Sequence, residues 1–550
     1  MEDRLTNIIR KIDLASLHKL VGKVILKAIK TVNSGEDEKA LAEILILKHG
    51  TLLLNNKEIR IGIINSLSLS EAGNLCKNAD LSPSKDFKAY EELINYFGYG
   101  YNIFKSKLFV DFLEVTSLFY YKPINDNREA KEIISAKFGE EIKILGYLHD
   151  YQKRVKDEVM SRLNHKFEKS FFVQMPTGAG KTYTALECVT DLMRKPRLIN
   201  ENQQPIAEKF IVWLVDKNEL AEQALVSFKK LWKIRGDHEI NAFRLFKDFQ
   251  PDFIKENGGV VFAGFDKLYS ILNNPNHTSF QSVKHLITNT DLLIIDEAHH
   301  SIAETYFTCI NQFRDVPFIK IMGLSATPGS KDYETTQSLI SLYSSDKISI
   351  RNSNWEPIED VITYLQQGGY LATLKTQLLE TGASSNENSE DRVLDDLASN
   401  SERNRKILDQ IKLADEAKES TVVFACTLDH VYALLILCRS IGINAKYIIG
   451  DIEQADRIDI LNEFKEKKYN ILINLDILST GIDLPNINKV IIARPINSPN
   501  LISQILGRAL RGPKNGGNSL NTIINIKDNL INFPGTSFLY NYYQGSWDKI

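Results

Sequence analysis

The stretch Phe171-Phe172-Val173-Gln174-Met175-Pro176-Thr177-Gly178-Ala179-Gly180-Lys181-Thr182 decides the fold of this chain. It predicts a short apolar strand, a loop with two glycines, and a helix that begins at Lys181-Thr182. This is the context of a phosphate-binding loop, because glycines let the backbone close around a phosphate with its N–H groups pointing inward. Lys181 would reach the β- and γ-phosphates of a nucleotide, and the Thr182 hydroxyl would bind Mg²⁺. Met175 stands where the general pattern has its first glycine, so the loop alone could also be a fortuitous glycine-rich turn.

A second stretch, Leu292-Leu293-Ile294-Ile295-Asp296-Glu297-Ala298-His299-His300, predicts another apolar strand that ends in two acids. Asp296 would hold the Mg²⁺ through water, and Glu297 would position and deprotonate the water that attacks the γ-phosphate. The two stretches together therefore predict a site for ATP and Mg²⁺.

Two further stretches are Ser325-Ala326-Thr327 and Gln504-Ile505-Leu506-Gly507-Arg508-Ala509-Leu510-Arg511. In this order, the four stretches resemble motifs I, II (a DEAH box), III and VI of the superfamily 2 helicases and translocases. The resemblance covers residues 148–527 of the 550-residue chain. It implies an α/β fold with two RecA-like parallel-sheet lobes, which a mainly helical N-terminal domain precedes here.

The resemblance also implies a role for each motif residue. Gln152, in the run Leu148-His149-Asp150-Tyr151-Gln152, would recognise adenine, because its amide offers both a donor and an acceptor. Arg508 and Arg511 would enter from the second lobe as arginine fingers and act in catalysis with Lys181, Asp296 and Glu297. The expected nucleotide-binding residues are Gln152, Thr177, Gly178, Ala179, Gly180, Lys181, Thr182, Gly481 and Asp483.

The run Leu475-Asp476-Ile477-Leu478-Ser479-Thr480-Gly481-Ile482-Asp483 resembles motif V. By that resemblance Thr480 touches the nucleic-acid backbone, while Gly481 and Asp483 couple the strand site to the nucleotide site. The expected metal ligands are Thr182 and Asp296. The residues expected to couple the ATP site to the second lobe are His299, Ser325, Thr327 and Gln504.

The adjacent histidines His299 and His300, and the two arginines of motif VI, each have an alternative interpretation. Adjacent histidines can be metal ligands, but no Cys or carboxylate cluster at ligand spacing accompanies His299 and His300 beyond the motif's own acids. Arg508 and Arg511, three residues apart, could form a solvated helix face. Gln504 and Gly507 in the same register favour motif VI instead.

The pattern along the chain predicts four segments: a helical accessory domain (1–140), a first RecA-like lobe that binds ATP (141–330), a connecting segment with a mobile loop (331–400) and a second RecA-like lobe (401–550). From Glu141 onward, short apolar runs alternate with helices, which is typical of a parallel sheet. In the first segment, Ser68-Leu69-Ser70-Glu71 has the spacing of a capping box. The aromatic residues in 99–121 either form a buried core or, with neighbouring lysines, stack on unpaired bases.

Composition describes an ordinary soluble chain, with 43% hydrophobic and 25% charged residues. The net charge of -3 argues against a protein that coats nucleic acid by bulk positive charge, so DNA or RNA would lie in a local groove. Five scattered cysteines indicate neither a zinc site nor a disulfide framework. The absence of a long apolar run or an apolar signal segment predicts a cytoplasmic protein without membrane contact.

The sequence of the phosphate loop helps to decide which group of superfamily 2 the chain resembles. The loop is Met175-Pro176-Thr177-Gly178-Ala179-Gly180-Lys181-Thr182, whereas RNA helicases with a DEAH box normally show Gly-Glu-Thr-Gly-Ser-Gly-Lys-Thr. Three other stretches resemble the motor part of type I and type III restriction subunits and of helicases from bacterial anti-phage systems: Leu214-Val215-Asp216 with Glu219-Leu220, Thr480-Gly481-Ile482-Asp483-Leu484-Pro485, and Leu506-Gly507-Arg508-Ala509-Leu510-Arg511-Gly512-Pro513. That resemblance implies double-stranded or forked DNA as substrate. An ATP-driven switch without translocation and an RNA helicase remain the alternatives.

A restriction nuclease needs an Asp and a Glu-x-Lys on neighbouring strands, and Glu141-Ile142-Lys143 supplies only the bare tripeptide, with Asp111 and Glu114 upstream. We therefore expect the nuclease to be a separate chain. Residues 1–140 are its expected dock, and their removal would leave much of the DNA-stimulated ATPase.

Overall fold

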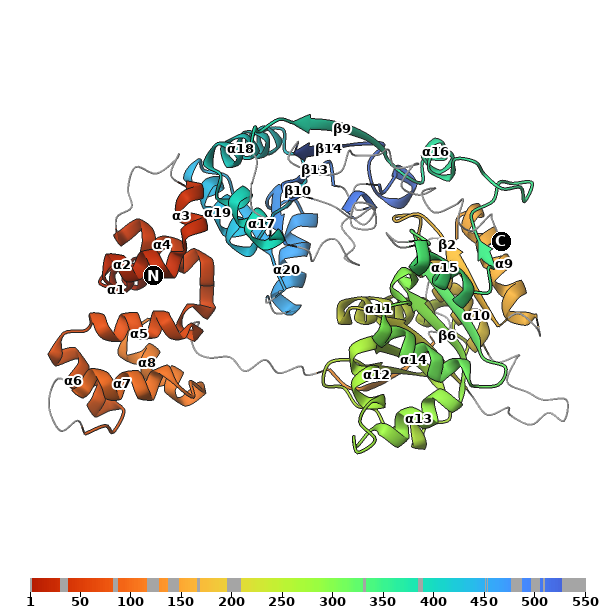
Figure 1. The fold of residues 1–550 in the computed structure, drawn as a ribbon, viewed down its shortest axis with the longest axis horizontal. Coiled ribbons are helices and arrows are strands. Elements are labelled where there is room, and N and C mark those ends of the chain that lie inside the picture. The colour runs from red at the N-terminus through yellow and green to blue at the C-terminus, as the bar shows by residue number, and fades with distance from the viewer. Residues whose placement is uncertain are drawn as a thin grey trace.

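The computed structural model describes residues 2–29, 38–82, 88–115, 128–136, 148–165, 169–194, 209–329, 333–383, 389–450, 452, 454–475, 487–495, 505–507 and 510–526. Three parts are visible: N-terminal helices and two lobes, each built on a sheet (Figure 1). The two predicted RecA-like lobes and the helical N-terminal region are confirmed.

The first lobe contains an eight-stranded sheet in the order β1-β4-β5-β3-β6-β7-β2-β8. Its strands are β1 (Lys131–Ile134), β2 (Ser170–Gln174), β3 (Phe210–Val215), β4 (Ile240–Leu245), β5 (Gly259–Gly264), β6 (Thr290–Asp296), β7 (Lys320–Ser325) and β8 (Lys347–Ile348). Its helices are α9 (Asp150–Asn164), α10 (Lys181–Met193), α11 (Asn218–Arg235), α12 (Phe265–Leu272), α13 (Phe280–Thr288), α14 (Glu304–Arg314) and α15 (Tyr333–Leu342).

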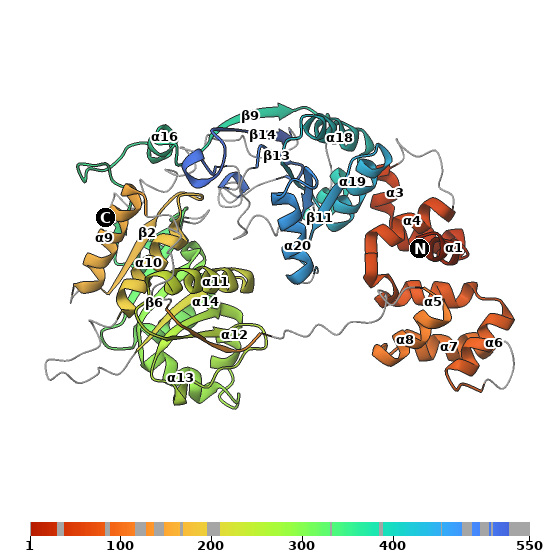
Figure 2. The same cartoon turned by 180° about the vertical axis from the view of Figure 1, so that it is seen from behind.

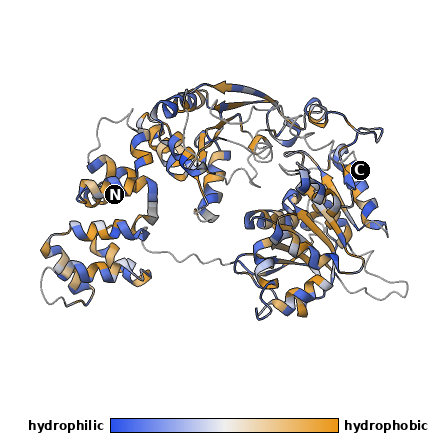
Figure 3. Cartoon of the chain, in the orientation of Figure 1, coloured by the Kyte–Doolittle hydropathy of each residue, from blue (hydrophilic) through white to orange (hydrophobic). Residues whose placement is uncertain are grey.

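Two inner strands of this sheet, β3 and β5, are apolar along their whole length and buried at every residue. Such continuous burial follows from parallel pairing, because the crossover helices cover both faces of the sheet. The colouring by hydropathy shows these hydrophobic strands between amphipathic helices (Figure 3). Parallel pairing also brings the carboxyl ends of β2, β6 and β7 to one edge, where a ligand site is expected.

The first lobe begins earlier than the sequence predicted. β1, within the stretch assigned to the helical domain, pairs antiparallel with β4 at the sheet edge. Arg244, only 2% exposed, holds it there, with Nη2 2.6 Å from Glu132 Oε1 and Nε 2.8 Å from Glu222 Oε2. β1 has only four residues and one partner strand, so it is too short for a repeating hydrophobic pattern to mark it in the sequence.

The second lobe has a parallel six-stranded sheet in the order β11-β12-β10-β13-β14-β9. Its strands are β9 (Thr373–Leu379), β10 (Thr421–Phe424), β11 (Ala445–Ile448), β12 (Ile471–Asn474), β13 (Lys489–Ile492) and β14 (Leu520–Ile526). Its helices are α17 (Glu390–Ser399), α18 (Ser401–Glu416), α19 (Leu428–Ser440) and α20 (Gln454–Lys465), and α16 (Val361–Gln367) precedes β9.

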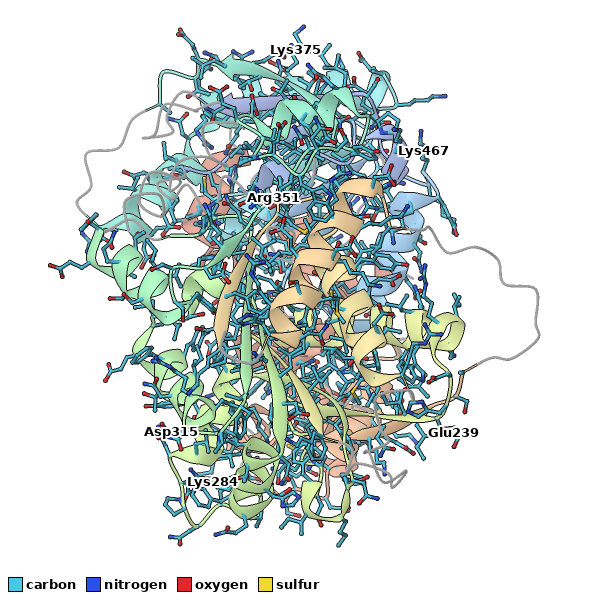
Figure 4. All side chains as sticks on the ribbon, turned by 90° about the vertical axis from the view of Figure 1, so that its right-hand side faces the viewer. Glu239, Lys284, Asp315, Arg351, Lys375 and Lys467 are labelled. Atoms are coloured by element: carbon cyan, nitrogen blue, oxygen red, sulfur yellow. The ribbon has the colours of Figure 1, made fainter. Side chains whose placement is uncertain are left out.

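The predicted connecting segment does not form a unit of its own. β8 joins the first sheet, and β9 pairs with β14 in the second. After β8, Arg351 returns to the first lobe, where its Nε lies 2.7 Å from Glu158 Oε1 on α9; Arg351 is labelled in Figure 4. Of the expected mobile loop, positions 384–388 lie outside the described residues.

The N-terminal helices are α1 (Glu2–Ile9), α2 (Leu14–Val21), α3 (Lys23–Ile29), α4 (Glu38–His49), α5 (Lys57–Ser66), α6 (Leu69–Asn78), α7 (Lys88–Gly98) and α8 (Ile103–Phe112). The predicted capping box at the start of α6 is confirmed: Glu71 N donates to Ser68 Oγ at 3.3 Å, and Ser68 N donates to Glu71 Oε2 at 2.8 Å. These two bonds satisfy backbone N–H groups that the first helical turn leaves without partners.

These helices share one hydrophobic core with the second lobe. Leu17, Val21 and Ile25 belong to the same buried cluster as Val431 and Leu434 of α19. α19 is buried at every residue from 430 to 438, because the sheet covers one side and α3 and α4 pack on it from another. Figures 1 and 2 both place the N-terminal helices beside the second lobe. The helical region is therefore anchored to the second lobe, although the chain enters the first lobe next.

Candidate functional site

The phosphate-binding loop runs from the end of β2 to the start of α10, as predicted. Gly178 and Gly180 have φ values of +87° and +79°, in the left-handed region that glycine adopts without strain. A Cβ at Gly180 would also lie 2.3 Å from Gln152 Nε2. Both glycines are thus required by the backbone, and the loop presents the N-terminus of α10 to an anion.

The charged residues of motifs I and II meet in one cluster, in which Asp296 is buried and Lys181 and Glu297 are partly buried. Lys181 Nζ lies 3.1 Å from Glu297 Oε1 and 3.4 Å from Asp296 Oδ1. Thr182 Oγ1 lies 3.5 Å from Asp296 Oδ2, so a hydroxyl and a carboxylate oxygen stand side by side. Oxygen ligands of this kind fit Mg²⁺. Among the described residues, no group of three or more His, Cys, Asp and Glu forms a separate metal cluster.

One ammonium group, that of Lys181, offsets part of the negative charge of two carboxylates in this cluster. Burial would raise the pKa of Glu297, but the ammonium group of Lys181, with His299, lowers it to about 2. Burial raises the pKa of Asp296, against the opposing effect of Lys181. Glu297 is therefore charged and paired with Lys181. Phosphates that drew Lys181 away would remove this partner, so the basicity of Glu297 would increase when a nucleotide binds.

Glu297 also has a strained backbone. Its φ is +51°, which is rare for a residue with a side chain, and its N–H donates to Asp296 Oδ1 at 3.0 Å. Strain of this kind persists where the surrounding structure fixes the conformation, and it concentrates at functional sites.

The residues predicted to couple the site to the second lobe lie together. His299 Nδ1 is 2.9 Å from Ser325 Oγ and 3.4 Å from Glu297 Oε2. Ser325 Oγ donates to the Thr327 carbonyl at 3.1 Å, and Thr327 N donates to Ser325 Oγ, also at 3.1 Å. Because the Ser325 proton points to Thr327, the proton in the His299 contact belongs on Nδ1. Motif III is thus joined to Glu297 through one imidazole.

His299 is expected to stay neutral across the physiological pH range. Burial, opposed by Glu297, lowers its pKa from 6.5 to about 3. The contribution of this group to folding stability is therefore complete above pH 6.5 and is lost as the pH falls towards 3. Histidine-selective ¹⁵N NMR should show an imidazole that does not titrate between pH 5 and 8 and is absent from the His299→Asn variant. A titration midpoint near 6.5 would contradict the prediction.

The second lobe contacts the phosphate loop directly. A Cβ at Gly507 would lie 2.0 Å from Thr177 Cγ2, and one at Gly178 would lie 3.4 Å from Leu371 Cδ2. This closeness explains why motif VI has glycine at 507. Arg511 is described and partly buried. The predicted residues Thr480, Gly481, Asp483, Gln504 and Arg508 lie outside the described residues.

Comparison with known proteins identifies both lobes. Residues 146–330 match the family described as "Type III restriction enzyme, res subunit", and residues 403–513 match the helicase conserved C-terminal domain. The motor of this chain is that of a superfamily 2 helicase. The two matches place motifs I to III in the first helicase lobe and motif VI in the second.

Individual relatives match parts of this motor. A Saccharomyces cerevisiae protein named as an ATP-dependent helicase, IRC3, is 28% identical over 370 residues, 66% of this chain. The chain spans 49% of the length of that relative. The ATP-dependent rRNA helicase RRP3 of Scheffersomyces stipitis is 41% identical over 73 residues, 13% of this chain and 15% of that one. The fragment structure of an HsdR subunit of a type I restriction enzyme from Vibrio vulnificus has a TM-score of 0.47 and 18% identity, covering 70% of this chain and 66% of that chain.

Outside the helicase motor, the structure divides the aromatic stretch of the helical region. Phe109 is buried in the core, whereas Phe104 and Tyr99 are 69% and 60% exposed. The core interpretation is therefore confirmed for Phe109, whereas base stacking by the exposed aromatic residues stays a prediction. Positions 116–121, and the tripeptide Glu141-Ile142-Lys143, lie outside the described residues. In the described part of the chain, no helix is both long and apolar enough to cross a membrane.

Proposed function

We propose that this chain is an ATP-dependent DNA helicase or double-stranded DNA translocase, the motor of a restriction or anti-phage defence system. The observation that carries the proposal is the match of residues 146–330 to the type III restriction res subunit. It is supported by the cluster of Lys181, Asp296 and Glu297, which has the composition that γ-phosphate hydrolysis needs.

In this proposal each lobe contributes part of the reaction. Lys181 leaves Glu297 to bind the phosphates, and Glu297 then orients the attacking water and accepts its proton. Thr182 and Asp296 would hold Mg²⁺, which would supply positive charge to the phosphate oxygens. Arg508 and Arg511 stabilise the charge that develops on the γ-phosphate, so the site is complete only when the lobes close.

The coupling residues link hydrolysis to the nucleic acid. We assign Thr480 to contact with the nucleic-acid backbone. Gly481 and Asp483 would couple the nucleic-acid site to the nucleotide site. The residues assigned to coupling between the two lobes are Gln504, His299, Ser325 and Thr327. The hydrogen bonds that join His299, Ser325 and Thr327 support the lobe-1 half of this relay.

Double-stranded or forked DNA is expected to stimulate ATP hydrolysis more than RNA does. The test is a steady-state ATPase assay with duplex DNA, forked DNA, single-stranded DNA and RNA of equal length, at one stated salt concentration, because phosphate contacts make binding salt-dependent. Stimulation by RNA alone would contradict the restriction-type assignment. RNA helicase is the second candidate, favoured by the stretch shared with the rRNA helicase RRP3.

An ATP-driven switch is the third candidate, and no stimulation by any polynucleotide would favour it.

We further propose a separate nuclease subunit as partner and a cytoplasmic location. DNA from the same reactions, run on a gel, should remain intact in Mg²⁺, since this chain lacks a complete nuclease motif in its sequence. Cleavage by the purified chain would refute the separate nuclease.

A further inference from the structure

A short strap joins the two lobes beside the ATP site. It consists of residues 368–372, which follow α16, and residues 510–515, which include the last two residues of motif VI. Three backbone hydrogen bonds hold its two parts together: Ala372 N to Leu510 O at 2.7 Å, Gly512 N to Tyr370 O at 3.1 Å and Lys514 N to Gly369 O at 3.0 Å. A Cβ at Gly512 would lie 2.7 Å from Gly369 O, so the two parts are packed backbone to backbone.

The strap rests on the first residues of the glutamine motif. The ring of Tyr370 lies 4.7 Å from that of His149 and 4.9 Å from that of Tyr151, centroid to centroid. His149 Nε2 lies 2.8 Å from Asn515 Oδ1, and Asn515 Nδ2 donates to the Tyr370 carbonyl at 2.8 Å. Because a carbonyl accepts only from the Nδ2 of the amide, Oδ1 faces His149, and His149 Nε2 carries the proton of that bond.

These contacts reach the residue assigned to the base of the nucleotide. His149 N donates to Gln152 Oε1 at 2.8 Å, and Gln152 Nε2 donates to the Ala179 carbonyl at 3.1 Å. The Gln152 amide is therefore held between His149 and the phosphate loop. Anything that fixes His149 also fixes the orientation of this amide.

We propose that Asn515 and His149 are positioning residues that make recognition of the nucleotide base depend on where the second lobe stands. Asn515 belongs to the second lobe and His149 to the first, so their hydrogen bond exists only in one arrangement of the lobes. In that arrangement Gln152 is preorganised for the base, which lowers the conformational entropy lost on binding. The inference rests on the ATP-site part of the proposed function and is independent of the choice between DNA and RNA.

The test measures nucleotide affinity without turnover, in full-length protein carrying Glu297→Gln. A fluorescent ATP analogue is displaced by ATP and, separately, by inorganic tripolyphosphate, which lacks a base. Asn515→Ala should weaken ATP binding about three- to tenfold, the effect of one partly buried hydrogen bond, and leave tripolyphosphate binding unchanged. Asn515→Asp should restore only part of the ATP affinity, because its carboxylate still accepts from His149 but cannot donate to the Tyr370 carbonyl as the Asn515 amide does.

Asn518→Ala is the matched control. Asn518 is a second-lobe amide three residues away, and its Nδ2 donates to Ile487 O and Asn521 Oδ1, both at 3.0 Å and both within the second lobe. An equal loss for Asn518→Ala would overturn the inference, and so would unchanged ATP affinity in Asn515→Ala. Equal weakening of ATP and tripolyphosphate would also overturn it, since the strap would then act on the phosphate loop. If the Glu297→Gln parent itself binds no ATP, the ATP-site assignment fails first.

Discussion

Lys181→Ala is expected to reduce ATP hydrolysis by ~10³-fold or more, because the Lys181 ammonium stands at the phosphate loop beside Asp296 and Glu297, where it would bind the transferred phosphate. The variant also leaves Asp296 and Glu297 as adjacent acids without their cation, so nucleotide binding should weaken as well. Steady-state release of phosphate measures the first effect, and displacement of a fluorescent nucleotide measures the second.

Glu297→Gln should also abolish turnover, but it should retain nucleotide binding, because the amide keeps the shape of the side chain and only its function as a base is lost. Lys209→Ala is the matched control: its Nζ pairs with Asp291 Oδ1 at 2.7 Å at the amino ends of β3 and β6, and both side chains are about half exposed. Its ATPase rate should equal that of the wild type. Persistent turnover in Lys181→Ala or Glu297→Gln would mean that the catalytic site lies elsewhere.

Ile25→Asp is expected to destabilise the second lobe by about 4 kcal/mol or more, because it places a carboxylate in the core that α3 shares with α19. Thermal unfolding followed by circular dichroism should show the main transition at a lower temperature, with reduced recovery of folded protein. Lys27→Asp is the control on the same helix, since Lys27 is exposed, and it should unfold like the wild type.

The shared core changes what truncation should do. The sequence suggested a removable accessory domain, but deleting residues before β1 would expose the outer face of α19, which includes Val431 and buried leucines. We expect the truncated chain to aggregate and to lose its ATPase with its fold. A soluble truncated chain with an unchanged melting temperature would restore the interpretation of the region as an independent dock.

The ATP cluster could be predicted from the sequence because each of its motifs is local. A strand, two glycines and a Lys-Thr pair specify the phosphate loop by backbone geometry alone, and β2, β6 and β7 then place their carboxyl ends together by parallel pairing. The sequence assigned His299 and Ser325 a coupling role but not a mutual hydrogen bond; they meet because both lie at or just beyond the ends of neighbouring strands.

Contacts between distant segments could be decided only by the tertiary structure. Asn515 and His149 are 366 residues apart, and neither belongs to a motif that indicates the other. The packing of α3 on α19 was hidden for the same reason: an apolar stripe shows that a helix face is buried but not what buries it. β1 has four residues and one edge partner, too little for a periodic signal. Short runs of sequence determine the phosphate loop and the acidic motif, because backbone geometry and residue type within each run are sufficient. The packing partner of a helix or loop depends instead on the shape and position of whole lobes.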